Sequence, residues 1–377
     1  MSSLLGFILA LSLIIYTIID PKGGDSPFKW VVYSMMLWLP IHLISVKKIC
    51  IRYGKIMFRW MLGFLTLFSC HIFFANEQPL NDIILFMSFF SLSAIALTTR
   101  LQTSVWICLL IIFLLESIIT LPSGFSYVGY SDGWNGFFQN SNTNSIFICS
   151  TLIATLLECK NKKLRYLIIV LALIGIIASR SRNALLVYLI IVICIVFEYK
   201  LQKYQRWFPY ILVGLLFFAG YYMLVIEPSS REAGVEMFGK DQGSAGRSLQ
   251  LIYLISNFDL SAWGHGRYIN TIVENYTGYQ VHNVFVASFY VLGLIISITY
   301  LAYIYWLYRN SHSYKFKICL LAIQFYLFFE PGYFFSVQLF CYLPMLVLCS
   351  NFYRQSKFNK DDSYIGQERI SKLLANL

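Results

Sequence analysis

A succession of apolar segments separated by short polar connections constrains the fold of this 377-residue chain more than any other feature. A membrane-spanning helix needs about 20 consecutive apolar residues, and about 12 segments approach that length. Charged residues make up only 12% of the chain, whereas soluble domains carry about 25%. The sequence therefore predicts an all-α polytopic integral membrane protein. Its apolar segments are residues 3–19, 30–46, 56–75, 83–98, 105–121, 146–158, 164–179, 183–198, 208–226, 284–306, 317–330 and 333–350.

One long polar stretch interrupts this pattern at residues 227–283. We expect residues 1–226 to form nine transmembrane helices with short loops, and residues 284–350 to form three more. The stretch 227–283 is then a large loop with short amphipathic helices, and residues 351–377 are a terminal tail. The polar loop is the place where chemistry outside the membrane is expected.

The formal net charge of +11 reflects lysines and arginines that gather in every second loop. Cytoplasmic loops of membrane proteins carry such an excess, so these loops and both termini are expected to be cytoplasmic. The long loop then faces outward. This placement argues against nucleic acid as a partner. None of the nine cysteines lies in the long loop, so no disulfide framework is expected there.

One short outer connection breaks the charge rule, because Arg180 and Arg182 lie between the segments 164–179 and 183–198. In one interpretation the two side chains simply extend to lipid phosphates in a tight turn. In the other they form an anion site, since two guanidinium groups beside a helix N-terminus suit a phosphate. The second interpretation is preferred.

The long outer loop contains further candidates for a site. Arg247 opens an apolar run of about 12 residues, too short to span a membrane, which predicts an interfacial or re-entrant helix. A glycine-rich run, Gly264-His265-Gly266-Arg267, follows. His282 abuts the next apolar segment, where it can act as a general base or can merely lie at an interface beside Asn283, which caps the helix.

The outer connection after residue 121 combines aromatic residues with Ser, Gly, Asn and Gln. Such a set can bind sugars through flat apolar faces and amide groups, and Trp134 and Asn140 are the candidates. An aromatic belt at the membrane interface is an equal alternative. No metal-binding motif occurs, so no metal and no cofactor are expected.

Several of these pieces together resemble the O-antigen polymerase and O-antigen ligase group of bacterial envelope glycosyltransferases. They are Ser181-Arg182-Asn183-Ala184-Leu185-Leu186 at the start of an apolar segment, the run led by Arg247, Gly264-x-Gly266, and His282-Asn283 followed by nine residues and Gly293. The ligase pattern departs at Gly293-Leu294-Ile295-Ile296, so the polymerase is preferred.

The resemblance implies a GT-C-like, metal-independent glycosyltransferase of the bacterial inner membrane, with its active site facing the periplasm. Its donor would be an undecaprenyl-diphosphate-linked oligosaccharide. Carried over by position, Arg182 and Arg247 hold the diphosphate, Arg180 assists them, and His282 deprotonates the acceptor hydroxyl. Further substrate contacts are expected from Asn283, Arg267, Trp134 and Asn140. Membrane lipids are expected partners, and a chain-length-regulating membrane protein is a further candidate.

Three alternatives remain open. An O-antigen ligase would use the same chemistry with a lipid A-core acceptor. A lipid-linked oligosaccharide flippase would transport the substrate without reaction, but the apolar segments carry few charges to line a cavity. A structural or interaction protein of the envelope is the third alternative.

Overall fold

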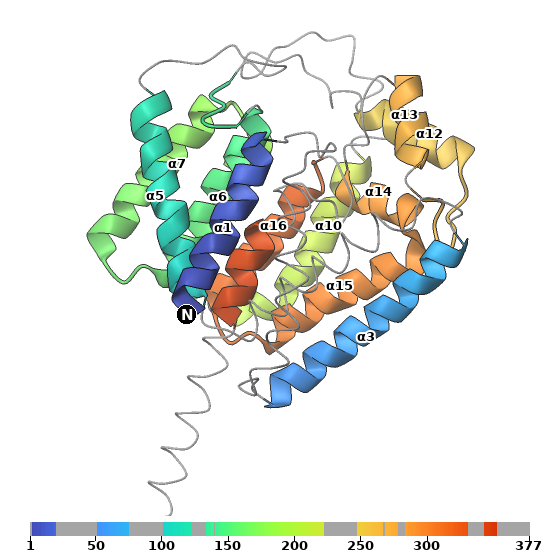
Figure 1. Ribbon diagram of the computed structural model, residues 1–377, viewed down its shortest axis with the longest axis horizontal. Helices are drawn as coiled ribbons and strands as arrows, with labels where there is room; N and C mark the ends of the chain where they lie inside the picture. Colours follow the sequence, from blue (N-terminus) through green and yellow to red (C-terminus); the bar gives the residue numbers. More distant parts are fainter. Residues whose placement is uncertain are drawn as a thin grey trace, which may run out of the picture.

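The computed structural model describes residues 2–19, 51–74, 101–121, 133–138, 140–221, 247–266, 268–277, 283–330 and 343–352. Every regular element in these ranges is a helix, which confirms the predicted all-α class for this part of the chain. The helices form one bundle with two short helices at one end (Figure 1). They are α1 (Ser2–Ile19), α3 (Ile51–Phe74), α5 (Gln102–Thr120), α6 (Ser141–Glu158), α7 (Lys162–Ala178), α8 (Arg182–Val196), α9 (Glu198–Leu201), η1 (Gln202–Trp207), α10 (Phe208–Tyr221), α12 (Arg247–Asn257), α13 (Tyr268–Thr277), α14 (Val284–Val291), α15 (Gly293–Asn310) and α16 (Tyr314–Leu327), with a last apolar helix at Leu343–Phe352.

The predicted apolar segments are mostly helical where the structure describes them, apart from a few residues at helix ends and breaks. The segments 30–46 and 83–98 lie outside the described residues. The segment 284–306 differs from expectation, because two helices, α14 and α15, occupy it and meet at Leu292. Gly293, with a φ of 88°, starts the second helix after this break. Only glycine adopts this left-handed conformation without steric cost.

The described helices are mostly shorter than a membrane is thick. Within these ranges, α5 alone has the length and hydropathy to cross a bilayer, and a second span is counted if α8 and the α9–α10 stretch, bent by 83°, are taken together. The helices α7, α8 and α16 have only 17, 15 and 14 residues. The described helices themselves therefore do not support the expectation of about 12 transmembrane helices.

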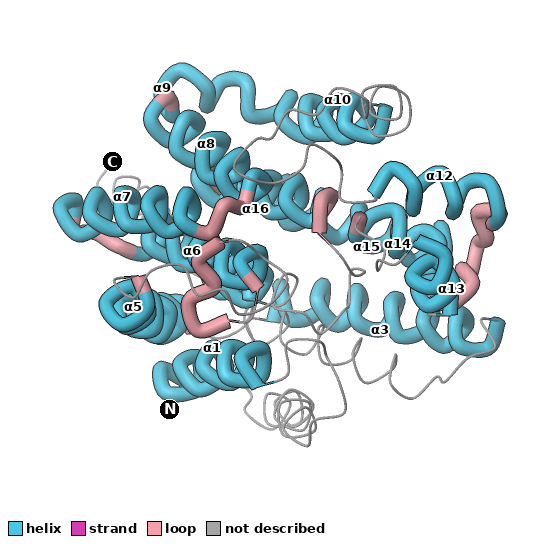
Figure 2. The backbone as a smooth tube through the Cα atoms, turned by 90° about the horizontal axis from the view of Figure 1, so that it is seen from above, coloured by secondary structure: helices cyan, strands magenta, loops and turns pink. Residues whose placement is uncertain are grey.

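Polar contacts define one end of the bundle, where α6 and α8 begin and α5, α7 and α16 finish. The hydroxyl groups of Ser145 on α6 and Ser179 after α7 are 2.7 Å apart. The Tyr326 hydroxyl on α16 donates to the carbonyl oxygen of Asn142 on α6, at 3.1 Å. The turn that carries Arg180 and Arg182 lies between α7 and α8, so we call this end the arginine end. Figure 2 shows α6, α8 and α16 side by side when the bundle is seen from above.

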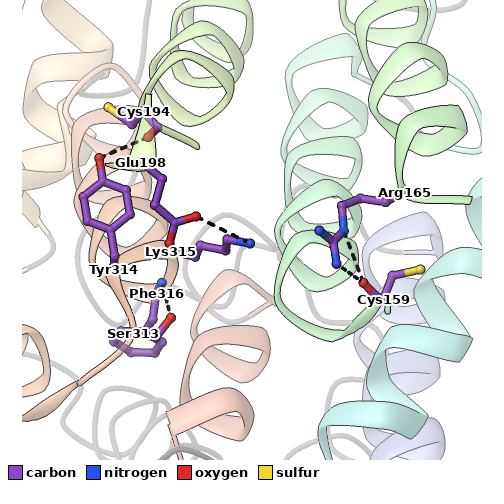
Figure 3. A network of polar contacts seen from close by, with 8 residues as sticks. All are labelled: Cys159, Arg165, Cys194, Glu198, Ser313, Tyr314, Lys315 and Phe316. Carbon is purple, nitrogen blue, oxygen red and sulfur yellow. Dashed lines mark hydrogen bonds and ion pairs between the residues drawn. The ribbon is translucent and has the colours of Figure 1, made fainter. Parts of the chain in front are cut away.

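A second set of contacts ties the helices together at the opposite end (Figure 3). The Tyr314 hydroxyl at the start of α16 donates to the carbonyl oxygen of Cys194 near the end of α8, at 3.1 Å. Lys315 and Glu198 form an ion pair at 3.7 Å. The basic residues of the described connections gather at this opposite end: Lys160, Lys162, Lys163, Arg165, Lys200, Lys203, Arg206, Arg309, Lys315 and Lys317.

The interior of the bundle is more polar than parts of its surface. Helix α6 is buried continuously from Asn144 to Leu156, and four hydroxyl side chains in it donate to carbonyl oxygens of the preceding turn. By contrast, the exposed side chains of α7 and α10 include Val170, Ile174 and Phe217. No residue of α10 is buried by the rest of the bundle, although the helix is apolar all round. A helix of this composition needs an apolar environment around it.

Candidate functional site

The arginine turn joins α7 to α8 through only three residues. Helix α7 ends at Ala178 and α8 begins at Arg182. Arg180 adopts a left-handed conformation with a φ of 53°, the one positive φ among the described non-glycine residues. Such a conformation is unfavourable for a residue with a Cβ atom and persists where the surroundings fix it. Ser181, the residue that caps α8, makes no side-chain capping bond. The first N–H groups of α8 are therefore not satisfied by that side chain.

The described part of the aromatic connection, residues 133–138, holds this turn from one side. The Trp134 N–H donates to the carbonyl oxygen of Ala178 at 2.9 Å, and its indole Nε1 donates to the Thr120 hydroxyl at 2.8 Å. A Cβ atom on Gly133 would lie 2.3 Å from the carbonyl oxygen of Ser179. Only glycine permits so close a backbone approach. The connection therefore packs directly on the end of α7.

The two sugar-binding candidates of this connection lie in different surroundings. Trp134 is only 2% exposed, so its ring contacts other helices and no face of it is open to a sugar in this structure. Asn140 is exposed and caps α6, where its Oδ1 accepts from the Asn142 N–H at 2.8 Å. Both positions thus have a local structural role. Their roles in substrate binding stay predictions.

A buried carboxyl group, Glu116 of α5, organises the interior side of the same connection. Its Oε1 accepts from the Phe137 N–H at 3.0 Å. A Cβ atom on Gly136, whose φ is 59°, would fall 1.3 Å from that oxygen. Asn144 on α6 donates to the Trp134 carbonyl oxygen at 3.2 Å. The other oxygen of Glu116 and the Oδ1 of Asn144 make no hydrogen bond among the described residues.

The other side of the arginine turn is tied to the end of α16. Asn183, in the first turn of α8, donates from Nδ2 to Oε1 of Glu330 at 3.1 Å. Glu330 has 0% exposure, and the hydroxyl of Tyr326 lies beside it. The sequence gives no local signal for this contact, because 147 residues separate Asn183 from Glu330.

The start of α14 lies at the same end of the bundle. The rings of Phe285 on α14 and Phe328 after α16 are 6.2 Å apart. Asn283 caps α14, with its Oδ1 accepting from the Val286 N–H at 3.0 Å. Asn283 is buried, and its Nδ2 makes no hydrogen bond within the described ranges. His282, the predicted base, precedes it and lies outside the described residues, as does Arg267.

Two short helices occupy the described part of the predicted outer loop. Helix α12 begins at Arg247, where the sequence predicted a helix of about 12 residues, and has 11 residues. It packs against α13 through stacked rings of Tyr253 and Tyr276, 4.2 Å apart. Each helix buries one face, through Leu254 on α12 and Val273 on α13. The backbone of Arg247 is thus in the first turn of a surface helix at the arginine end (Figure 1).

The glycine motif of this loop docks on the break between α14 and α15. The N–H groups of His265 and Gly266 donate to the carbonyl oxygens of Tyr290 and Val291, at 2.9 and 3.0 Å. In the other direction, two N–H groups at the start of α15 donate to carbonyl oxygens of the loop, Leu294 to Ser261 at 3.1 Å and Ile295 to Ala262 at 3.2 Å. These four hydrogen bonds, which we call the clamp, satisfy backbone groups that the break leaves free.

Two glycines face each other in the clamp. A Cβ atom on Gly264 would lie 2.5 Å from the nitrogen of Gly293, and one on Gly293 would lie 2.4 Å from the nitrogen of Gly264. Both have positive φ, 76° and 88°. Helix α3 covers the clamp, because Nδ1 of His71 hydrogen-bonds the Trp263 carbonyl oxygen. The motif glycines therefore fix where the outer loop joins the bundle.

Arg180, Arg182 and Asn283 thus lie at the arginine end, and α12, which begins at Arg247, lies at the same end of the bundle. Buried acids that the sequence did not single out as site residues, Glu116 and Glu330, lie behind the arginine turn. In each case the sequence signal was a single acidic residue within an apolar segment, because burying an ionisable group there costs free energy. In the residues that the structure describes, no three His, Cys, Asp or Glu side chains gather to hold a metal ion. The chain matches no protein-family model, no curated protein and no solved structure.

Proposed function

We propose that this chain is an O-antigen polymerase, a glycosyltransferase of the bacterial inner membrane. It would join oligosaccharide units linked to undecaprenyl diphosphate at the periplasmic face. One observation carries the proposal: the arginine turn before α8 and the start of α14, next to the predicted base His282, are both packed against the end of α16. Arg182 and the start of α14, about 100 positions apart in the chain, thereby lie at one end of the bundle. In the proposal they would supply a cation and the neighbouring base there.

The distribution of polarity supports a membrane location. Exposed apolar side chains on α7 and α10 are unfavourable in contact with water, whereas lipid chains would cover them. The buried hydroxyl groups of α6 donate hydrogen bonds to backbone carbonyl oxygens of their own helix, as polar groups in an apolar medium require. The basic connections gather at the end opposite the arginine end, as the positive-inside rule expects for a cytoplasmic face. About 12 spans, with a large periplasmic loop, remain part of the proposal.

The proposed reaction is a single displacement at the anomeric carbon of the donor sugar. His282 takes the proton from an acceptor hydroxyl, and that oxygen forms a bond to the anomeric carbon. The bond from this carbon to the diphosphate oxygen breaks, so undecaprenyl diphosphate leaves and the configuration inverts. Arg182 and Arg247 would stabilise the negative charge on the leaving diphosphate, since guanidinium groups bind two oxygens at once.

The lipopolysaccharide profile of a deletion strain tests the function. A polymerase defect leaves core carrying a single unit, whereas a ligase defect leaves core without any unit. Purified protein supplied with the lipid-linked donor alone should form a ladder. A ladder that requires core lipid would indicate the ligase instead, and no product in either assay would refute the glycosyltransferase proposal.

Substitutions test the proposed site in the same strain. His282→Ala and Arg182→Lys should both abolish long chains at normal membrane abundance, the second because lysine lacks the planar fork of arginine. Long chains in the His282→Ala strain would refute the base assignment. Full activity of Arg182→Lys would mean that Arg182 only fixes the orientation of the chain in the membrane and does not bind the diphosphate.

A further inference from the structure

The buried acid Glu330 has no assigned part in the proposed chemistry, although it lies directly behind the arginine turn. It follows α16, and 0% of its surface is exposed. Its Oε1 accepts the Nδ2–H of Asn183 at 3.1 Å. Asn183 is the neighbour of Arg182 in the first turn of α8. A contact between two such distant segments fixes where that turn lies relative to α16.

The arginine turn depends on contacts of this kind because it is not stabilised by a cap of its own. Ser181 makes no side-chain capping bond, and Arg180 occupies a left-handed conformation. Trp134 holds the end of α7 through the carbonyl oxygen of Ala178. The side chain of Asn183, in the first turn of α8, hydrogen-bonds Glu330 just beyond the end of α16. This contact links the α8 side of the turn to α16.

We propose that Glu330 is a positioning residue of the diphosphate site, which holds the first turn of α8 through Asn183 and so aims Arg182. This inference rests on the proposed function and deepens it. A guanidinium group binds two phosphate oxygens only in a narrow range of orientations. A displacement of about 1 Å in a positioned group can reduce a rate by about 100-fold.

The position of Glu330 fits support of Arg182 rather than contact with substrate. A side chain without exposed surface cannot reach an acceptor hydroxyl unless the helices separate. An acceptor oxygen is what Asn183 needs from it, and a glutamine supplies that oxygen equally well. Removal of the acceptor instead deprives the part-buried Nδ2–H of Asn183 of this partner.

The test compares Glu330→Gln, Glu330→Ala, Asn183→Ala and the double alanine variant, each purified in lipid nanodiscs. The measurements are the Kd for undecaprenyl diphosphate and the KM and kcat for polymerisation. Glu330→Ala and Asn183→Ala should each raise Kd and KM by about 10- to 100-fold, while Glu330→Gln stays close to wild type. The double variant should be no worse than Glu330→Ala, because the hydrogen bond that Asn183→Ala removes is already absent in it.

A matched control is available on the same stretch of chain. Gln324 of α16 is also buried, and neither of its side-chain polar atoms has a partner in the described ranges. Gln324→Leu should therefore keep the wild-type Kd while it alters a buried polar site of α16. If Glu330→Ala does not fold, Asn183→Ala and Glu330→Gln carry the test, since the first must be defective and the second must not.

Three outcomes would overturn the inference. Wild-type Kd and KM in Asn183→Ala or in a folded Glu330→Ala would show that the contact is not needed. Additive losses in the double variant would mean that Glu330 acts by another route. A defect in Glu330→Gln as large as that of the alanine variant would mean that the acid itself is required. If wild type binds undecaprenyl diphosphate but forms no polymer, the proposed function fails while the Kd comparison still decides the role of Glu330.

Discussion

Substitution of Gly293 by alanine tests the clamp between the outer loop and the break of α14 and α15. A Cβ atom there would lie 2.4 Å from the nitrogen of Gly264 and from the carbonyl carbon of Trp263, and 2.5 Å from the oxygen of Ala262. All three neighbours are backbone atoms, so no side chain can rotate away. The φ of 88° adds a second cost, because a residue with a Cβ atom disfavours the left-handed region.

The magnitude follows from these two terms. The left-handed conformation costs about 1–2 kcal/mol for a residue other than glycine, and overpacking costs about 1–3 kcal/mol. We therefore expect Gly293→Ala to destabilise the protein by about 2–5 kcal/mol. If the loop undocks instead, the loss is confined to the four hydrogen bonds of the clamp.

Two measurements on the purified protein separate these cases. Titration with SDS in mixed micelles, followed by circular dichroism, reports global unfolding. Hydrogen exchange reports the clamp through the amides of His265, Gly266, Leu294 and Ile295. The control is Gly214→Ala in α10, where a Cβ atom meets nothing within 4 Å and alanine should be neutral or favourable. If Gly293→Ala matches this control in both measurements, the reasoning about the clamp is wrong.

Two further substitutions address the interior of the arginine end. Gly136→Ala should destabilise the protein by about 2–5 kcal/mol in the same SDS titration, because its Cβ atom would fall 1.3 Å from Oε1 of Glu116 at a φ of 59°. Gly63→Ala, with open space around it, is the control, and equal stability of the two variants would contradict the predicted clash. Glu116→Gln should be as stable as wild type or more so, since it keeps the acceptor for the Phe137 N–H and adds a donor near the unsatisfied Oδ1 of Asn144. Glu116→Ala should lose about 1–3 kcal/mol, and a glutamine variant as unstable as the alanine variant would count against this account.

The positions of the helices could be predicted from the sequence because they depend on local patterns. The length of the apolar segments located α1, α5 and α7, and the short apolar run that Arg247 opens located the start of α12. The break at Gly293 could not be predicted in the same way. The hydropathy of residues 284–306 is continuous, and the break is stabilised by a loop that lies earlier in the chain.

The surroundings of Trp134 show which structural contacts composition alone cannot predict. Aromatic and amide side chains suit a sugar surface, and they equally suit a connection that folds back into a bundle. The burial of Trp134 follows from Thr120, Ala178 and Glu116, which supply an acceptor for its indole, an acceptor for its N–H and an anchor for the residues beyond it. None of these pairings has a signature in the local sequence.

The clamp also has a consequence for how a lipid-linked substrate could enter the proposed site. If part of the outer loop moves to admit the substrate, a hinge is expected where the fewest interactions must break. Separation of residues 261–266 from α14 and α15 would break four backbone hydrogen bonds at once, beside the hydrogen bond between His71 and Trp263. Opening at the clamp is therefore costly, and the break between α14 and α15 would keep its position if another part of the loop moved.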